Sequence, residues 1–286
     1  MPATLEEALT ILDGSPDARP LGGGVAVLLR SRSGVALAPR YVAVARIPAL
    51  RDRRLDPSGE IVLGGAVTLA ELAGDPLVRR HLPLLAAAAG RAASPGIRSV
   101  ATLAGNLVDA PATSDLAAAL IAARASARLR SASDERTIPL DELCAGGAGP
   151  LEMGRGELLV EIRAPAAADA AWSLQRLQTQ GAADRSAATV AIRWVVRNER
   201  VVDVGVAAAA VSARPIRLAA VERTLTGSAM ADLRTGTLDA AVRAAAEVDA
   251  SGSPLLEDLR GSAEYRRAML AVLAARAVAE AAARRP

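Results

Sequence analysis

The sequence predicts an α+β protein built from two successive parts, and three observations lead to this prediction. A short strand, a triple-glycine turn and a helix follow one another over 18–30. The composition shifts at the alanine- and proline-rich segment 164–168, which has the character of a linker. After it, three strand-like runs precede three helix-like runs, which is the layer pattern of an α+β domain. A chain of 286 residues, 51% of them hydrophobic, is long enough to bury two such cores.

The first part begins with a helix and a small β-α-β unit. Thr4 and Glu7 have the spacing of a capping box, which predicts a helix over 5–12 that ends at Gly14. The unit that follows is expected to have a strand at 18–21, a helix at 25–30 and a strand at 41–47.

A second group of elements is predicted between the β-α-β unit and the linker. Thr68 and Glu71 form another capping box, so a helix should begin there and end near Gly74. One longer helix is expected from Asp75-Pro76 to just before Ser94, because proline is tolerated at the first helical position. The other expected elements are strands at 60–67, 128–131, 136–139 and 157–163, a helix at 116–125 and a flexible glycine-rich loop at 146–150.

The second part reads as a sheet followed by helices. Strands are predicted at 172–178, 187–196 and 201–211, and the last two flank a polar turn at 197–200, so they should form a hairpin. The helices are predicted at 216–225, 238–248 and 263–283.

Composition excludes several classes of function. The 34 basic residues are all arginine, they are scattered among 31 acidic ones, and aromatic residues make up 1% of the chain, so nucleic-acid binding is not expected. A single cysteine, Cys144, excludes an internal disulfide and a cysteine-ligated metal or cluster. A single histidine, His81, excludes a multi-histidine metal site. No signal peptide or membrane span is evident, which predicts a cytoplasmic protein.

Two runs of small residues are the candidate ligand loops. Gly22-Gly23-Gly24 ends one strand and begins a helix, so bare amides and a helix N-terminus would meet there, as a diphosphate requires. It is not the six-residue dinucleotide fingerprint, and the acidic residue expected some twenty positions later is missing, which argues against a Rossmann fold. The alternative for this run is a plain tight turn.

The second run, 102–106, lies in the most informative stretch of the chain, 99–115. Its backbone amides and the side chains of Thr102 and Asn106 are suitable donors for phosphate oxygens. Asp115 precedes an apolar run, where it either caps a helix or accepts from a ribose hydroxyl. Together the two runs could hold one extended dinucleotide from both sides.

On these segments the chain resembles the FAD-binding medium subunits of the molybdenum hydroxylases, which include the carbon monoxide dehydrogenase flavoprotein and the flavin domain of xanthine dehydrogenase. Residues 18–27 match the first flavin motif of that family, and residues 94–106 match the second, more specific one. Residues 63–72, 157–165 and 261–267 fit as well, in the same order along the chain.

The resemblance implies an FAD-binding domain at 1–166, with subdomains of about 1–50 and 51–166, followed by a C-terminal domain at 170–286 with a three-stranded sheet and helices. It assigns residues to the FAD diphosphate and its surroundings, to the ribose region (Asp115) and to the flavin ring. The first group is Leu21, Gly22, Gly23, Gly24, Val25, Ala26, Val27, Thr102, Ala104, Gly105 and Asn106; Leu107, Val108 and Arg176 are expected close to the flavin.

The resemblance further implies an electron-transfer subunit. Electrons from a molybdopterin-containing large subunit would cross an iron–sulfur subunit to FAD on this chain and leave to an external acceptor, within a hetero-oligomer. No residue of this chain is then needed as a catalytic acid, base or metal ligand. The single cysteine fits, because the clusters must lie on another chain.

The chain also departs from the family pattern. Gly24, Val25 and Ala26 stand where polar residues are usual, and Ala104 stands where the second motif usually has a glycine. These residues motivate an alternative, a structural subunit of the same complex that has lost or weakened flavin binding. A second alternative, a stand-alone FAD oxidase of the vanillyl-alcohol-oxidase-like group, lacks a histidine or cysteine placed for covalent flavin attachment.

Overall fold

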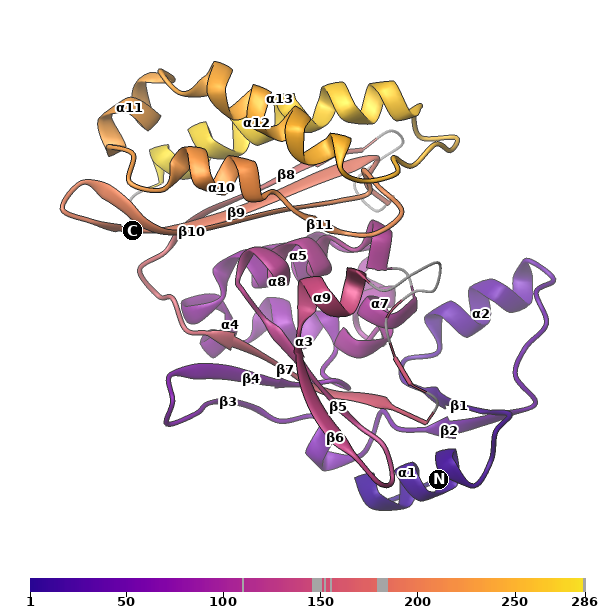
Figure 1. The fold of residues 1–286 in the computed structure, drawn as a ribbon. Coiled ribbons are helices and arrows are strands. Elements are labelled where there is room, and N and C mark those ends of the chain that lie inside the picture. Colours follow the sequence, from indigo (N-terminus) through magenta and orange to yellow (C-terminus); the bar gives the residue numbers. More distant parts are fainter. Residues whose placement is uncertain (110, 146–150, 152, 155, 179–184, 285–286) are drawn as a thin grey trace.

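The computed structural model describes residues 1–286 with the exception of 110, 146–150, 152, 155, 179–184 and 285–286. In this described part the strands form three sheets, of two, five and four strands. The five-stranded sheet and its helices lie between the small N-terminal unit and the four-stranded C-terminal sheet (Figure 1).

The N-terminal unit has the predicted β-α-β order. Helix α1 (Leu5–Asp13) is capped by Thr4, whose hydroxyl accepts from the Glu7 amide. Strands β1 (Ala18–Leu21) and β2 (Arg40–Ala43) pair in parallel, and α2 (Val25–Arg32) connects them. The second strand is shorter than the predicted 41–47, because the chain turns at Ile47-Pro48 into the 3₁₀ helix η1 (Pro48–Leu50).

The five-stranded sheet is antiparallel throughout and carries its helices on one face (Figure 1). Its strands are, in spatial order, β3 (Arg53–Leu55), β4 (Glu60–Gly64), β7 (Leu158–Pro165), β5 (Ser126–Arg130) and β6 (Glu135–Pro139). The helices of this part are α3 (Leu69–Gly74), α4 (Pro76–His81), α5 (Pro83–Arg91), α6 (Pro95–Arg98), α7 (Leu103–Asp109), α8 (Asp115–Ala122) and α9 (Leu140–Ala145), with a 3₁₀ turn η2 (Pro111–Thr113).

Two predicted helices of this part differ from the structure. The single helix expected from Asp75 to Ser94 is two helices, because Pro83 has no amide hydrogen to continue α4, and α5 begins at that residue. Helix α8 stops at Ala122 rather than 125, since Arg124 adopts a left-handed φ of +57°. The loop predicted at 146–150 lies outside the described residues.

The C-terminal sheet is antiparallel in the order β11-β10-β9-β8. The long strands β8 (Ala171–Leu177), β9 (Ala188–Arg197) and β10 (Arg200–Ala209) are the three that were predicted, and Asn198 and Glu199 form the hairpin turn with φ of +51° and +57°. A short fourth strand, β11 (Ile216–Arg217), occupies the start of the predicted helix 216–225, so that α10 (Ala219–Leu225) begins later. Helices α11 (Met230–Thr235), α12 (Asp239–Ser251) and α13 (Ala263–Ala283) complete the domain.

The C-terminal sheet is covered on both faces. Helices α10 to α13 pack on its outer face, where they form one hydrophobic core with residues such as Trp194. On the inner face, Leu174, Ala191 and Ala207 belong to the same core as α5 and α8 of the first part. The two parts therefore share a core. Among the described helices, none is long and apolar enough to cross a membrane.

Candidate functional site

The two small-residue loops lie against each other. A Cβ added to Gly23 would lie 1.7 Å from the carbonyl oxygen of Val100, and one added to Gly22 would lie 2.7 Å from Thr102 Oγ1. Only glycine permits such an approach of two backbones. The structure therefore brings together the runs 22–24 and 100–106, which are about eighty positions apart in the sequence.

Thr102 organises the contact between the loops. Its side chain is 3% exposed, and its hydroxyl accepts from the Gly105 amide at 3.2 Å. A Cβ on Gly105 would lie 2.8 Å from the same hydroxyl, so glycines surround Thr102 from both loops. The Leu103 and Ala104 amides donate to the carbonyls of Val67 and Gly65, which fixes the turn to the segment that follows β4.

Helix α2 begins at this contact with an uncapped N-terminus. Gly24 is its N-cap with a left-handed φ of +75°, and no side chain accepts from the first amides of the helix. Those amides have no partner within the helix and carry its positive dipole end. No acidic residue lies in the first turn, and residues 21–27 are neither fully buried nor fully exposed. The glycine loop thus presents donors, not acceptors, to an approaching group.

Of the residues that follow Ala104, two lie at the loop contact and two pack on the core. Asn106 lies at the contact, where its Oδ1 accepts from the Ser114 hydroxyl at 2.5 Å, and Gly105 is exposed. Leu107 is fully buried in the core, which corrects the expectation that it lies near the flavin ring. Val108 is half-buried against the same core.

The methyl group of Ala104 faces the protein interior. Ala104 packs against the first core, and its Cβ lies 3.1 Å from the position that a Cβ on Gly65 would take. The backbone of Ala104 is held by Gly65, and the methyl lies on that same side. The expectation that a side chain at this position obstructs a ligand is therefore not supported by the geometry.

Asp115 and Arg176 form a buried ion pair between the two parts of the chain. Asp115 Oδ2 lies 2.8 Å from Arg176 Nε, and both side chains are less than 8% exposed. The other carboxylate oxygen accepts from the hydroxyls of Ser186 and Thr189. Burial raises the pKa of Asp115, and the Arg176 charge and the two hydroxyls act in the opposite direction.

This arrangement corrects one of the two alternatives for Asp115, that of the helix cap. The cap of α8 is Ser114, whose hydroxyl accepts from the Ala117 amide at 3.0 Å, and Asp115 is the first helical residue. The Asp115 carboxylate already binds Arg176, Ser186 and Thr189, and its contact with a ribose hydroxyl stays a prediction. Ser114, Ser186 and Thr189 were not identified from the sequence, because single hydroxyl residues outside a motif carry no local signal.

The remaining candidates have structural roles. Cys144 is buried, and burial raises the pKa of its thiol to about 12, so the thiol stays protonated and unreactive. In the part of the chain that the structure describes, no group of three or more histidine, cysteine or acidic side chains could hold a metal ion.

The residues at the contact fit a diphosphate group. They offer an uncapped helix N-terminus, a stretch of glycine backbone that a Cβ would block, and the amide side chain of Asn106. No carboxylate stands in the first turn to repel an anion.

Comparison with known proteins identifies the family. The family model described as the FAD binding domain in molybdopterin dehydrogenase matches residues 1–167. This chain belongs to that family. A second model, the CO dehydrogenase flavoprotein C-terminal domain, matches residues 173–281. FAD is therefore the cofactor of this medium-subunit flavoprotein. The residues of the glycine loops suit its diphosphate.

Relatives of known activity cover nearly the whole chain. The carbon monoxide dehydrogenase medium chain of Hydrogenophaga pseudoflava is 31% identical over 97% of this chain and 94% of its own length. The nicotine 6-hydroxylase medium subunit of Paenarthrobacter nicotinovorans is 28% identical over 99% of this chain and 96% of its own.

The fold agrees with the solved structures of this family. The structure of the Hydrogenophaga pseudoflava carbon monoxide dehydrogenase that lacks the Mo-pyranopterin moiety of its cofactor superposes with a TM-score of 0.90 at 30% identity. The superposition covers 100% of this chain and 96% of that chain. The α+β fold with an FAD-binding domain and a C-terminal domain is confirmed.

Proposed function

We propose that this chain is the electron-transfer subunit of a molybdenum-hydroxylase complex, in which it accepts electrons from an iron–sulfur subunit and passes them to an external acceptor. The observation that supports this proposal best is the contact of the Gly22–Gly24 loop with the Thr102 turn at the uncapped start of α2. Relatives that match the whole chain are named as medium subunits or medium chains of oxidoreductases, which implies further subunits.

The chain's own residues bind and orient the cofactor. The amides at the start of α2 and the glycine backbone would hold the diphosphate, and Asn106, oriented by Ser114, would add a side-chain donor. When bound, FAD supplies the one- and two-electron chemistry, which side chains cannot provide.

The proposal assigns the metal centres to partner chains. The only cysteine is buried and protonated, so it cannot ligate a cluster. We therefore expect an iron–sulfur subunit and a molybdopterin-containing large subunit as partners.

The first test is a visible spectrum of the purified chain, followed by titration with FAD. The expected result is flavin absorbance with one FAD per chain, or binding of added FAD to the same level. A colourless chain that binds no added FAD would instead favour the alternative of a structural subunit without flavin.

The second test concerns electron transfer. The chain is mixed with its iron–sulfur and large subunits, and flavin absorbance is followed anaerobically after a substrate of the large subunit is added. Bleaching is expected only when all three chains are present. Bleaching without the iron–sulfur subunit would contradict the proposed electron path, whatever the first test shows.

A further inference from the structure

A buried arginine lies where the last helix meets the ends of two strands. Arg266 is in the first turn of α13, and its side chain is 1% exposed. Its guanidinium forms an ion pair with Asp258, a partly exposed residue of the loop before α13, and its Nε donates to the carbonyl of Gly261 at 3.3 Å. A guanidinium stays charged, so it is buried only where a carboxylate and carbonyl oxygens accept from it.

One nitrogen of this guanidinium joins the ends of β9 and β10. Arg266 Nη1 donates to the carbonyl of Ala187, just before β9, at 2.5 Å, and to that of Ala210, just after β10. The pairing of the two strands ends at Ala209 and Thr189. The arginine therefore holds the two chain segments together at the point where the backbone ladder has ended.

The Ala210 peptide continues this connection to the segment before α8. Ala210 leaves its strand with a left-handed φ of +61°, and its amide donates to the carbonyl of Ala112 in η2 at 2.5 Å. Two residues later, Ser114 caps α8 and donates its hydroxyl to Asn106 Oδ1 at 2.5 Å. The buried guanidinium is thus connected through one peptide and one turn to the side chain of Asn106.

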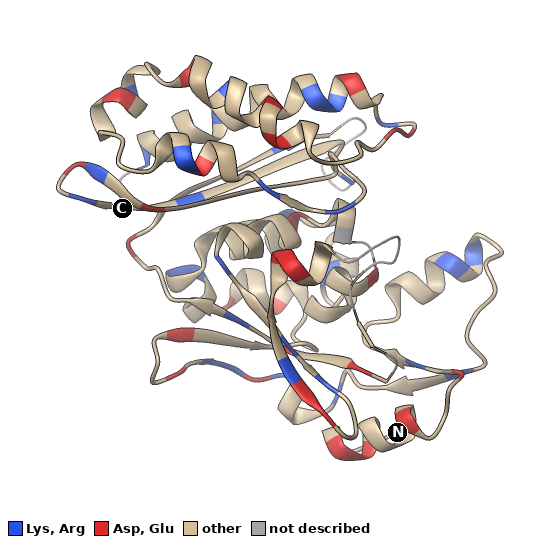
Figure 2. Cartoon of the chain, in the orientation of Figure 1, with Lys and Arg blue, Asp and Glu red and all other residues tan. Residues whose placement is uncertain are grey.

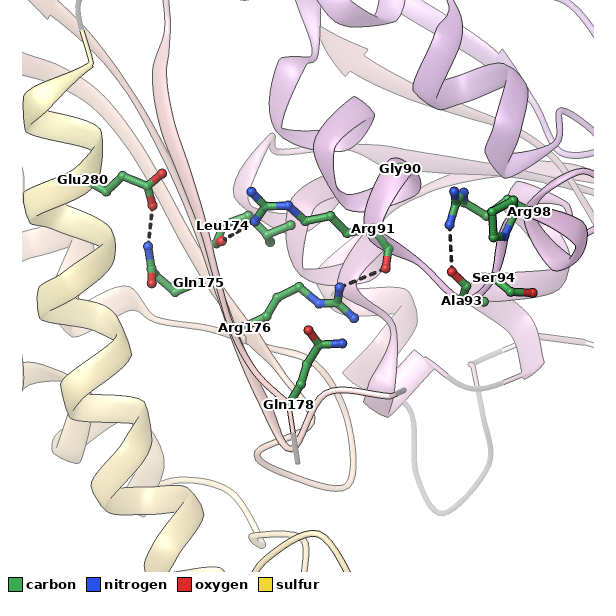
Figure 3. Close-up of a pocket in the computed structure, with 11 residues that line it drawn as sticks. Gly90, Arg91, Ala93, Ser94, Arg98, Leu174, Gln175, Arg176, Gln178 and Glu280 are labelled. Atoms are coloured by element: carbon green, nitrogen blue, oxygen red, sulfur yellow. Dashed lines mark hydrogen bonds between the residues drawn. The ribbon is translucent and has the colours of Figure 1, made fainter. Parts of the chain in front are cut away.

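A second connection reaches the same end of α8 through Ala187. The preceding residue, Ser186, donates its hydroxyl to Asp115 at 3.2 Å and accepts from Arg176 Nε at 3.0 Å. Arg176 and residues of the second flavin motif line a cavity of about 610 Å³, and Arg176 also donates to the last carbonyl of α5 at 2.9 Å (Figure 3). Both connections therefore end at the start of α8, beside the flavin-binding runs.

We propose that Arg266 is a positioning residue of the FAD site, which acts from the C-terminal domain by fixing the start of α8 and, through Ser114, the orientation of Asn106. Without the guanidinium, the carbonyls of Ala187 and Ala210 lose their common donor, and the turn before α8 can shift. The proposal rests on the proposed function, because it is Asn106 that would donate to the diphosphate.

The first test is flavin fluorescence titration of two Arg266 variants. Methionine has a similar length but no donor, so Arg266→Met should bind FAD at least about tenfold more weakly than the parent chain. Arg266→Lys keeps the charge and a single donor nitrogen, so it should weaken binding by only about two- to fivefold. If Arg266→Met does not fold, Arg266→Lys alone decides, and an unchanged FAD affinity in that variant contradicts the proposal.

The matched control is Leu270→Ala. Leu270 is fully buried one turn further along α13, in the core of the C-terminal domain, so its truncation leaves a cavity and lowers the unfolding midpoint. It removes none of the hydrogen bonds of Arg266, and FAD affinity should stay within about twofold of the parent chain. The control thus separates a loss of stability from a loss of position.

Hydrogen exchange tests the connection without FAD. The amides of Ala210 and Ala117 donate to the turn before α8 and to its capping hydroxyl. In the FAD-free chain, Arg266→Met should speed their exchange at least about tenfold more than Leu270→Ala does. If the parent chain binds no FAD, the proposed function fails in its own test, while this measurement still decides whether Arg266 holds the start of α8.

A double-mutant cycle identifies the route. Ser114→Ala removes the hydroxyl that orients Asn106, so adding Arg266→Met to it should weaken FAD binding by less than about twofold further. Fully additive losses would contradict a route through Ser114. A loss of FAD affinity in Leu270→Ala as large as that in Arg266→Met would show that affinity only follows stability. Unchanged affinity or unchanged exchange in Arg266→Met would overturn the proposal.

Discussion

Among the glycines, Gly23 has the least room for a side chain. The carbonyl oxygen of Val100 occupies the place where a side chain would begin, 1.7 Å from an ideal Cβ. The obstacle is backbone, which cannot rotate away as a flexible side chain would. Any larger residue must separate the two loops that meet at Thr102.

Gly23→Ala should therefore weaken FAD binding at least about tenfold and lower the unfolding midpoint, since the loops that suit the diphosphate would move apart. Flavin fluorescence titration and thermal unfolding measure the two effects. Gly96→Ala is the matched control, because a Cβ there meets nothing within 4 Å, and its stability should change by less than about 0.5 kcal/mol. Equal behaviour of the two variants would contradict the loop contact.

Ala104 is a departure from the family pattern that the structure accommodates. Its methyl packs inward toward Gly65 and the first core, away from the exposed backbone of Gly105. The family's glycine at this position would thus remove packing from helix α7.

For Ala104→Gly we expect FAD affinity within about twofold of the parent chain and a loss of about 0.5–1 kcal/mol in the free energy of unfolding. Urea denaturation and FAD titration provide the two measurements. A large gain in FAD affinity would show that the methyl group obstructs the cofactor after all.

At the scale of elements, α8 connects the two parts of the chain. All eight of its residues are buried, and its last carbonyl, that of Ala122, is so close to β10 that a Cβ on Gly205 would lie 1.9 Å away. At its first residue, Asp115 meets Arg176 of β8 and the hydroxyls before and within β9. The ion pair thus fixes one end of the helix to the C-terminal sheet.

Asp115→Ala should destabilise the chain by about 3–5 kcal/mol, because it leaves the Arg176 charge buried without its partner. Asp169→Ala is the comparison, since Asp169 and Arg197 form an exposed pair whose loss should cost at most about 1 kcal/mol. Chemical denaturation of both variants gives the difference. A cost for Asp115→Ala as small as that for Asp169→Ala would mean that Arg176 finds another partner.

The small-residue runs and Asp115 show how far the sequence could predict the site. The glycine run and Thr102–Asn106 were recognisable because small residues in a row are a local signal, and the structure places them in contact. The environment of Asp115 was not recognisable, since Arg176, Ser186 and Thr189 lie more than sixty positions later in the chain. Leu107 was misplaced for the same reason, because a helix face is assigned only by what packs on it.

Predictions of the elements succeeded where the signal was local. Capping residues placed the starts of α1 and α3, and the turn at 197–200 placed the hairpin. The break at Pro83 was missed because Leu82 and Leu84 continue an apolar pattern across it. The short strand β11 forms by pairing with β10, and no local sequence pattern predicts that pairing.

At the scale of the whole molecule, charged residues lie mainly on the outer surfaces of both parts, and few appear where α5 and α8 face the C-terminal sheet (Figure 2). Leu174, Ala191 and Ala207 of that sheet belong to the core of the first part. Without phenylalanine, this core consists largely of alanine and leucine, which lets the elements approach closely. The boundary between the parts is therefore a packed interior.

A fragment of residues 1–167 should consequently be much less stable than the full chain and should aggregate, because the faces of α5 and α8 that lie under the C-terminal sheet become exposed. The full chain should unfold in one cooperative transition. Calorimetry and size-exclusion chromatography test both expectations. A monomeric fragment with the stability of the full chain would show that the shared core contributes little.

Helix α2 has the opposite character, and its exposure has a consequence for local unfolding. None of its eight residues is buried, and the ion pair of Arg30 with Asp109 is its side-chain link to α7. A helix this short is marginal by itself, and its amides should therefore exchange with deuterium rapidly in the free chain.

A diphosphate held at its first turn would stabilise the helix, and exchange over 25–32 should slow at least about tenfold when FAD is added. Slow exchange without FAD would mean that the helix is ordered before the cofactor arrives. Rapid exchange would make α2 a segment whose order depends on the cofactor.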